Sequence, residues 1–134
     1  MNVAIIKYNA GNVQSVLYAM QRLGIDATVT DAYEKIRKAD KVIFPGVGHA
    51  SSAMESLKRK ELDKLIISLK QPVLGICLGL QLLCNYSEEG DTKCLGIFDA
   101  SVKRFEEKAP AEKSELFKIP HMGWNDIYNL SSPL

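Results

Sequence analysis

Short apolar runs alternate with amphipathic stretches along most of the chain. The runs are typical of strands buried on both faces of a parallel sheet, and they predict strands at 3–6, 27–29, 41–44 and 73–76. Apolar residues at helical spacing predict helices between them, over 13–23, from 31 and over 52–69. Such alternation with short connections is typical of a right-handed, doubly wound parallel sheet, whose ligands gather beyond the carboxyl ends of the strands. The pattern therefore predicts an α/β fold.

Local signals mark where these elements begin and end. Asn12 is the expected N-cap of the first helix, and Gly24 its left-handed stop. The segment 31–34, Asp-Ala-Tyr-Glu, has the form of a capping box at the start of the second helix. The segment 45–48, Pro-Gly-Val-Gly, is expected to end the third strand.

The pattern loosens after Tyr86. A turn at 88–91, short strands at 95–98 and 101–105, and a charged loop over 106–114 are expected there. The last residues carry no helix cap or stop signal. We interpret residues 1–134 as one domain whose doubly wound fold is cut short at its C-terminus.

Composition limits the class of protein and its setting. A chain of 134 residues with 46% apolar and 25% charged residues suits one soluble domain with a real core. It has no membrane-spanning stretch and no signal peptide, so we expect a cytoplasmic protein. Three cysteines without a Cys-x-x-Cys spacing favour reduced thiols over disulfides or zinc, and no metal or cofactor is expected. A net charge of +1 argues against nucleic acid as a partner.

The segment 72–81 carries the strongest chemical signal. An apolar strand runs into Cys77, which has Gly75 and Gly79 two positions to either side, and then directly into a Leu-rich helix. This arrangement is typical of a nucleophile elbow, because the glycines allow close packing and the helix N-terminus stabilises a thiolate. The alternative is a buried structural cysteine. The spacing favours Cys77 as the nucleophile.

The glycine-rich segment 45–48 is expected beside this elbow, at the same edge of the sheet. Glycines allow peptide N–H groups to point into a cleft, as an oxyanion hole requires. The expected donors are the N–H of Val47 or Gly48 and that of Leu78, the residue after the nucleophile. A dinucleotide-binding loop is disfavoured because Ser51 replaces the third glycine, and a plain strand-ending turn is the remaining alternative.

The chain supplies no clear base for this cysteine. His49 and His121 are its only histidines, and no His-x-Glu or His-x-Asp pair follows the elbow. A catalytic base must reach the thiol and be oriented by a third group, commonly a carboxylate. We interpret both histidines as ordinary surface or core residues.

Three motifs together resemble the triad glutamine amidotransferases, and among them the amidotransferase subunits of imidazole glycerol phosphate synthases. These are 75–81, Gly-Ile-Cys-Leu-Gly-Leu-Gln; 45–49, Pro-Gly-Val-Gly-His; and 120–125, Pro-His-Met-Gly-Trp-Asn. The resemblance implies a flavodoxin-like fold and hydrolysis of glutamine through a thioester on Cys77. It further implies that ammonia passes to a (β/α)8-barrel cyclase subunit as the partner in a heterodimer.

The resemblance also assigns roles to individual residues. It implies that glutamine is held by Gly46, Gly48 and Gln81. It places four residues toward the partner: Asn12, His121, Met122 and Trp124. The family's His-Pro-Glu motif, which supplies base and carboxylate, is not in the chain, so we expect these 134 residues alone to be inactive. A sheet that is cut short leaves apolar surface and an unpaired strand edge, so we also expect them to self-associate.

Two other classes remain open. One is a different elbow-cysteine hydrolase on the same sheet, which normally lacks the glutamine at position 81 and the motif at 120–125. The other is a non-catalytic interaction module, which the missing His-Glu pair keeps possible. Reaction of Cys77 with a glutamine-like electrophile distinguishes a glutamine amidotransferase from both of these classes.

Overall fold

The computed structural model describes residues 1–9, 11–105, 123, 124, 126, 128 and 129. The chain divides into two units, Met1–Lys103 and Arg104–Leu134. All helices and strands of the described residues belong to the first unit. The charged loop expected over 106–114 lies outside the described residues.

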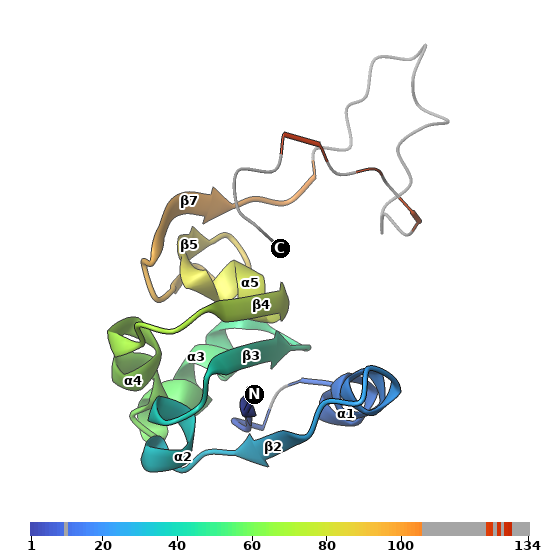
Figure 1. Ribbon diagram of the computed structural model, residues 1–134. Helices are drawn as coiled ribbons and strands as arrows, with labels where there is room; N and C mark the ends of the chain where they lie inside the picture. The colour runs from blue at the N-terminus through green and yellow to red at the C-terminus, as the bar shows by residue number, and fades with distance from the viewer. Residues whose placement is uncertain (10, 106–122, 125, 127, 130–134) are drawn as a thin grey trace. The chain divides into compact units, whose positions relative to one another are not determined.

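A four-stranded parallel sheet forms the centre of the first unit (Figure 1). Its strands are β1 (Val3–Ile6), β2 (Ala27–Thr30), β3 (Lys41–Gly46) and β4 (Val73–Cys77). They lie in the order β2-β1-β3-β4, so the chain places β2 on one side of β1 and β3 on the other. This is the flavodoxin-like order, and it puts the switch point between β1 and β3. The predicted fold class is confirmed.

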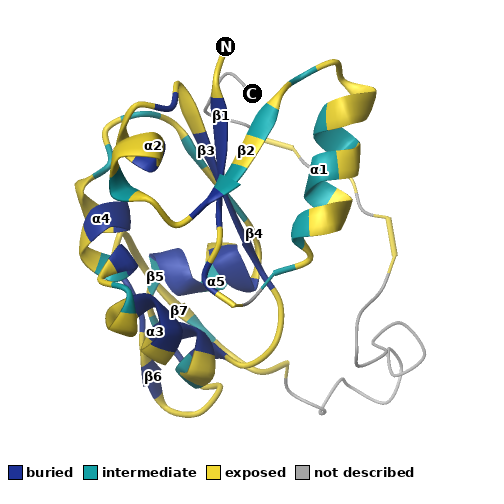
Figure 2. Ribbon diagram, turned by 90° about the horizontal axis from the view of Figure 1, so that it is seen from below, coloured by how far each residue is buried: buried dark blue, intermediate teal, exposed yellow. Residues whose placement is uncertain are grey.

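Helices cover both faces of the sheet (Figure 2). The helices are α1 (Val13–Arg22), α2 (Tyr33–Arg37), α3 (Ala50–Arg59), α4 (Leu62–Ser68) and α5 (Leu78–Leu83). On one face, Val3 and Ile5 pack against α1. On the other, Ile6 and Phe44 join the larger core that α2 to α5 form. This division follows from the two-residue period of a strand, which sends successive side chains to opposite faces.

A second, three-stranded sheet follows α5, in a region where the sequence predicted only short strands at 95–98 and 101–105; Ser101 and Val102 of the latter lie in its last strand. It contains β5 (Cys84–Ser87), β6 (Thr92–Lys93) and β7 (Phe98–Val102), in the order β6-β5-β7. The strand expected at 95–98 is wrong. Leu95 and Ile97 instead donate backbone hydrogen bonds to the carbonyls of Leu82 and Leu83, which docks this loop on the end of α5.

Several predicted boundaries also differ from the structure. The capping box is wrong: Ala32 is the N-cap of α2, and the Asp31 carboxylate pairs with Lys60 Nζ at 2.7 Å instead. The helical stretch after the third strand is two helices, because Glu61 adopts φ 55° between α3 and α4. α3 begins at Ala50, two residues earlier than expected, and β3 continues through Pro45 and Gly46.

Three glycines allow α5 to begin directly against β3 and β4. A Cβ added to Gly79 would lie 1.9 Å from the Phe44 carbonyl oxygen, which is backbone. A Cβ on Gly46 would lie 2.4 Å from the Gly79 nitrogen, and one on Gly75 would lie 2.7 Å from Leu80 Cα. Because these neighbours are main-chain atoms, they have no rotamer with which to move away. The close approach of helix and sheet therefore requires glycine at all three positions.

We expect Gly79→Ala to destabilise the protein by roughly 3 kcal/mol, at the upper end of ordinary overpacking, because the new methyl group meets backbone. Gly24→Ala is the control: its Cβ would meet nothing within 4 Å, and only its φ of 67° is unfavourable. That control should lose about 1 kcal/mol. Urea unfolding followed by circular dichroism measures both, and equal losses would contradict the packing argument.

Candidate functional site

Cys77 occupies a strained turn between strand and helix. Its backbone has φ 54° and ψ −119°, which is unusual for any residue other than glycine, and it directly precedes α5. Such strain persists only where the surrounding structure enforces it, and it is concentrated at functional sites. The close packing of the three glycines supplies that enforcement. The geometry is that of a nucleophile elbow.

Exposure separates Cys77 from the other two cysteines. Cys77 is exposed, Cys84 is half-buried and Cys94 is buried. Burial, together with the nearby Cys84, raises the pKa of the Cys94 thiol, so that thiol is a poor nucleophile. The Cys84 sulfur lies 3.8 Å from the Leu80 carbonyl, one helical turn earlier. The alternative of a buried structural cysteine therefore does not apply to Cys77.

The glycine-rich segment lies beside the elbow. In the ladder between β3 and β4, Gly46 is the register partner of Cys77. Val47 and Gly48 follow at once, Val47 with half of its surface exposed and Gly48 with φ 99°. Leu78 is the first residue of α5, so its N–H has no acceptor within its own helix. The structure thus gathers the residues expected to form an oxyanion hole at one edge of the sheet.

Gln81 lies on the same helix as the elbow. It is the fourth residue of α5, one helical turn after the elbow, and it is half-buried. The amide of Gln81 carries both donors and an acceptor. The structure thus describes all three residues that were expected to bind the substrate, Gly46, Gly48 and Gln81, and of these only Gln81 offers a polar side chain.

Tyr8 is a site residue that the sequence argument missed. Its side chain is fully buried, and its hydroxyl donates a hydrogen bond of 2.9 Å to the Pro45 carbonyl. Burial and, second, the charge of Cys77 raise the pKa of this phenol far above its usual value, so it stays protonated. The sequence signal that could have identified it is a tyrosine two residues after the end of a buried strand, where its hydroxyl can reach the same edge of the sheet.

His49 has a structural role. It is the N-cap of α3, and its Nδ1 lies 2.9 Å from Ser51 Oγ and accepts from the Ser51 N–H at 3.4 Å. A Cβ on Gly90 would lie 2.5 Å from His49 Cε1, so the ring rests against that turn. These contacts agree with an ordinary helix-capping histidine. His121 lies outside the described residues.

The residues expected at a partner interface are only partly described. Asn12 caps α1, because its Oδ1 accepts from the Ser15 N–H at 3.2 Å, and it is exposed. Trp124 belongs to the second unit and is fully exposed. Met122, like His121, lies outside the described residues. The structure therefore gives Asn12 a local role and leaves the other positions as predictions.

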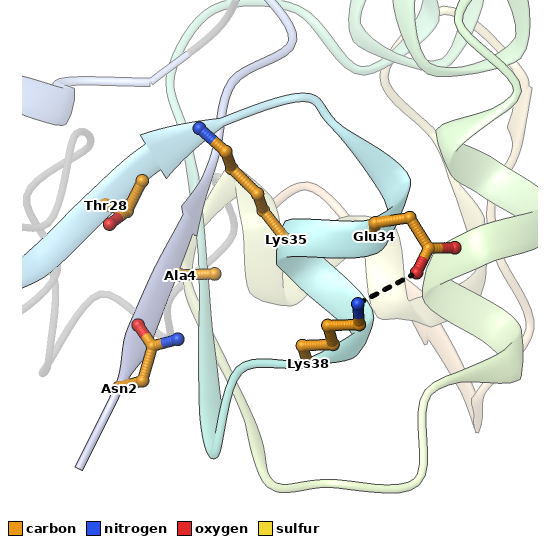
Figure 3. Close-up of a pocket in the computed structure, with 6 residues that line it drawn as sticks. All are labelled: Asn2, Ala4, Thr28, Glu34, Lys35 and Lys38. Atoms are coloured by element: carbon orange, nitrogen blue, oxygen red, sulfur yellow. Dashed lines mark ion pairs between the residues drawn. The ribbon is translucent and has the colours of Figure 1, made fainter.

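Two of the hollows on the surface of the first unit are lined by described residues. One, of about 300 Å³, is lined by Asn9, Val47, Gly48 and α3 residues that include Ser52, Ser56 and Arg59. The other, of about 380 Å³, lies where α2 passes the amino end of β1, away from the elbow (Figure 3). Its charged groups come from α2, where Glu34 and Lys38 form an exposed ion pair at 3.7 Å. The first of these hollows lies beside the glycine-rich segment, but Cys77 is not among the residues that line it.

Among the described residues, no group of three or more His, Cys, Asp or Glu side chains is placed to hold a metal ion. Within the same residues, no helix has the length and apolar character needed to cross a membrane.

Solved structures with a similar fold include two from different functional classes. One is a crystal structure of a glutamine amidotransferase, with a TM-score of 0.62, 21% identity, and coverage of 75% of this chain and 56% of that chain. The other is a putative peptidase E protein from Listeria monocytogenes EGD-e, with a TM-score of 0.59, 19% identity, and coverage of 86% and 72%. At these identities the similarity shows the fold alone.

Similarity in sequence is much higher. The chain is 58% identical over all 134 residues to imidazole glycerol phosphate synthase subunit HisH of Bacteroides fragilis strain YCH46, and spans 66% of its length. Against HisH of Idiomarina loihiensis it is 47% identical over 127 residues, 95% of this chain and 61% of that protein. The family model for class-I glutamine amidotransferases matches residues 4–129. The resemblance carried by the three motifs is thereby confirmed, and the chain belongs to the class-I glutamine amidotransferase family.

Proposed function

We propose that Cys77 is the nucleophile of a glutaminase subunit that delivers ammonia to an imidazole glycerol phosphate synthase reaction. The observation that carries this proposal is the exposed Cys77 at a strained strand-to-helix turn, with Gly46 in register beside it. The similarity to HisH proteins supports the choice of pathway, which is histidine biosynthesis. Because the chain spans 66% of the length of that relative, the activity of the complete protein is part of the proposal.

The proposed chemistry begins with attack of the Cys77 thiolate on the side-chain amide carbon of glutamine. A carbon–sulfur bond forms, and the negative charge moves to the amide oxygen. The N–H of Val47 or Gly48 and the N–H of Leu78 stabilise this oxyanion by hydrogen bonding. The carbon–nitrogen bond then breaks, and ammonia leaves with a proton from a general acid. Water hydrolyses the resulting thioester, which releases glutamate and restores the thiol.

The proton carrier for these steps is not His49, because its ring already caps α3. We propose that, in the complete protein, a His-Pro-Glu motif like that of the family supplies the base and its orienting carboxylate. Gln81, one helical turn after the nucleophile, and the backbone of Gly46 and Gly48 hold the substrate in this scheme. The role of these residues is positioning, which fixes the amide carbon near the sulfur.

Ammonia transfer requires a second subunit, and we propose a (β/α)8-barrel cyclase in a heterodimer. The exposed indole of Trp124 supports an interface, since tryptophan is enriched at protein contacts. We also assign Asn12, His121 and Met122 to contacts with the partner. An exposed, free nucleophilic thiol suits the reducing environment of the cytoplasm, where we place the enzyme.

We expect a glutamine-mimicking chloroketone to alkylate Cys77 at least about tenfold faster than Cys84 or Cys94, because only Cys77 combines exposure with the elbow. Peptide mapping by mass spectrometry gives the three rates, with glutamine added as a protecting competitor. Iodoacetamide serves as a reagent that needs no binding site. Faster reaction at Cys84 or Cys94, or no protection by glutamine, would refute the assignment.

Steady release of ammonia from glutamine is not expected of these 134 residues alone. Removing one member of a catalytic unit costs about as much as removing all of it, and the described histidine is occupied elsewhere. A coupled ammonia assay measures this, with Cys77→Ala as the background. Ammonia release that the Cys77→Ala substitution abolishes would show that the chain supplies its own base.

We also propose that the chain self-associates through the open edge of the sheet at β4. On this edge strand, the side chains of Leu74 and Ile76 are 52% and 39% exposed. Such an apolar edge favours pairing with another chain. Analytical ultracentrifugation should show concentration-dependent dimers, and Leu74→Lys with Ile76→Lys should remove them. Ile67→Lys on α4, which is 54% exposed, is the control. A monomer at all concentrations would contradict this.

A further inference from the structure

Tyr8 is the buried polar group near the elbow that the proposed chemistry does not use. It follows β1 and is fully buried, with its ring 5.2 Å from that of Phe44. Its hydroxyl donates to the Pro45 carbonyl at 2.9 Å. Its own backbone carbonyl accepts a hydrogen bond from Ser56 Oγ of α3. A single residue thus joins the end of β1, the end of β3 and the third helix.

We propose that Tyr8 is a positioning residue that holds the end of β3, and thereby the Val47–Gly48 peptide, in place for oxyanion binding. This inference rests on the proposed function, since it assigns a task to the same loop. It adds a residue that touches neither substrate nor sulfur and acts through Pro45.

The geometry explains why β3 needs such a support. β1 pairs with β3 only as far as Ile5 and Ile43, so the last residues of β3 have no strand neighbour on that side. Successive carbonyls of a strand point to opposite neighbours, and a buried carbonyl without a donor is costly. The Tyr8 hydroxyl supplies to Pro45 the hydrogen bond that β1 no longer provides.

Further contacts surround the same carbonyl. A Cβ on Gly11 would lie 3.3 Å from both the Pro45 oxygen and its Cγ, so the loop after β1 also rests on Pro45. A Cβ on Gly46 would lie 2.8 Å from the Tyr8 hydroxyl. Since Gly46 is the register partner of Cys77, the Tyr8 hydroxyl packs against a residue that neighbours the nucleophile across the ladder. We therefore expect a shift of the hydrogen bond between the Tyr8 hydroxyl and the Pro45 carbonyl to move the segment that carries Val47 and Gly48.

The hydrogen bond from the Tyr8 hydroxyl to Pro45 persists while the Cys77 thiolate is charged. Burial and the charge of Cys77 both raise the pKa of the Tyr8 phenol, so the hydroxyl remains a donor when the thiol ionises. Oxyanion donors act only within a narrow range of distance, and small displacements reduce their effect strongly. Tyr8→Phe keeps the ring that packs on Phe44 and removes only the donor.

The test compares two reagents on the 134-residue chain at about pH 8.5, near the pKa of an ordinary thiol. One is the glutamine-mimicking chloroketone, whose carbonyl oxygen occupies the oxyanion position, and the other is iodoacetamide. The measured quantity is the ratio of their alkylation rates at Cys77. Tyr8→Phe should lower this ratio about tenfold through the chloroketone rate, with the iodoacetamide rate unchanged.

Two further variants make the result specific. Tyr33→Phe is the matched control, because Tyr33 also donates its hydroxyl to a backbone carbonyl, that of Glu61, at 2.5 Å and away from the elbow. It should leave the ratio unchanged. Ser56→Ala releases the other end of the same support and should lower the ratio about threefold. If circular dichroism shows that Tyr8→Phe does not fold, the Ser56→Ala variant alone provides the test.

The outcomes separate the two ideas. If the unaltered chain reacts selectively with the chloroketone but neither Tyr8→Phe nor Ser56→Ala lowers the ratio, the role of Tyr8 is refuted and the proposed function stands. The same refutation follows if Tyr33→Phe lowers the ratio equally. If the unaltered chain shows no selectivity and no protection by glutamine, the proposed function fails, and the role of Tyr8 fails with it.

Discussion

Backbone contact between α5 and β3 is the constraint on which the rest of the site depends. Gly79 approaches the Phe44 carbonyl so closely that no side chain fits between them. Gly46 and Gly75 extend the same contact along β3 and β4. With the helix held this close, the single residue that links β4 to α5 has to turn sharply, and Cys77 accordingly adopts φ 54°. The exposed position of Cys77 thus follows from the close packing of Gly46, Gly75 and Gly79.

The sheet order converts this local turn into a site. β3 and β4 are neighbours in the same register, so the end of β3 is brought opposite the elbow. β1 lies on the other side of β3 but stops pairing at Ile5, and beyond that point the Tyr8 hydroxyl bonds to the end of β3. The edge is therefore built from three segments far apart in the sequence. Its polar groups are mostly backbone N–H and C=O, which explains how glycines and a proline can matter there as much as reactive side chains.

Local sequence signals were reliable where one strong signal acted alone. Asn12 caps α1 through its side chain, and Gly24 takes the positive φ that ends this helix. Signals failed where a distant partner competed for the same group. Asp31 has the pattern of a capping residue, yet its carboxylate pairs with Lys60, and the helix begins without a side-chain cap. Likewise, 95–98 has the apolar character of a strand, but the N–H groups of Leu95 and Ile97 bond to the end of α5, and only Phe98 is in a strand.

The sequence by itself determined the alternation of strands and helices, the glycine spacing around Cys77 and the family. These depend on neighbours a few residues apart, whose periodicity and turn chemistry can be read directly. Only the tertiary structure decided that Tyr8 packs against Gly46, that β3 runs on through Pro45, and that His49 caps a helix. Those facts depend on which groups meet across the sheet. A buried polar atom takes whichever partner the fold brings within hydrogen-bond distance, and no pattern along the chain specifies that partner in advance.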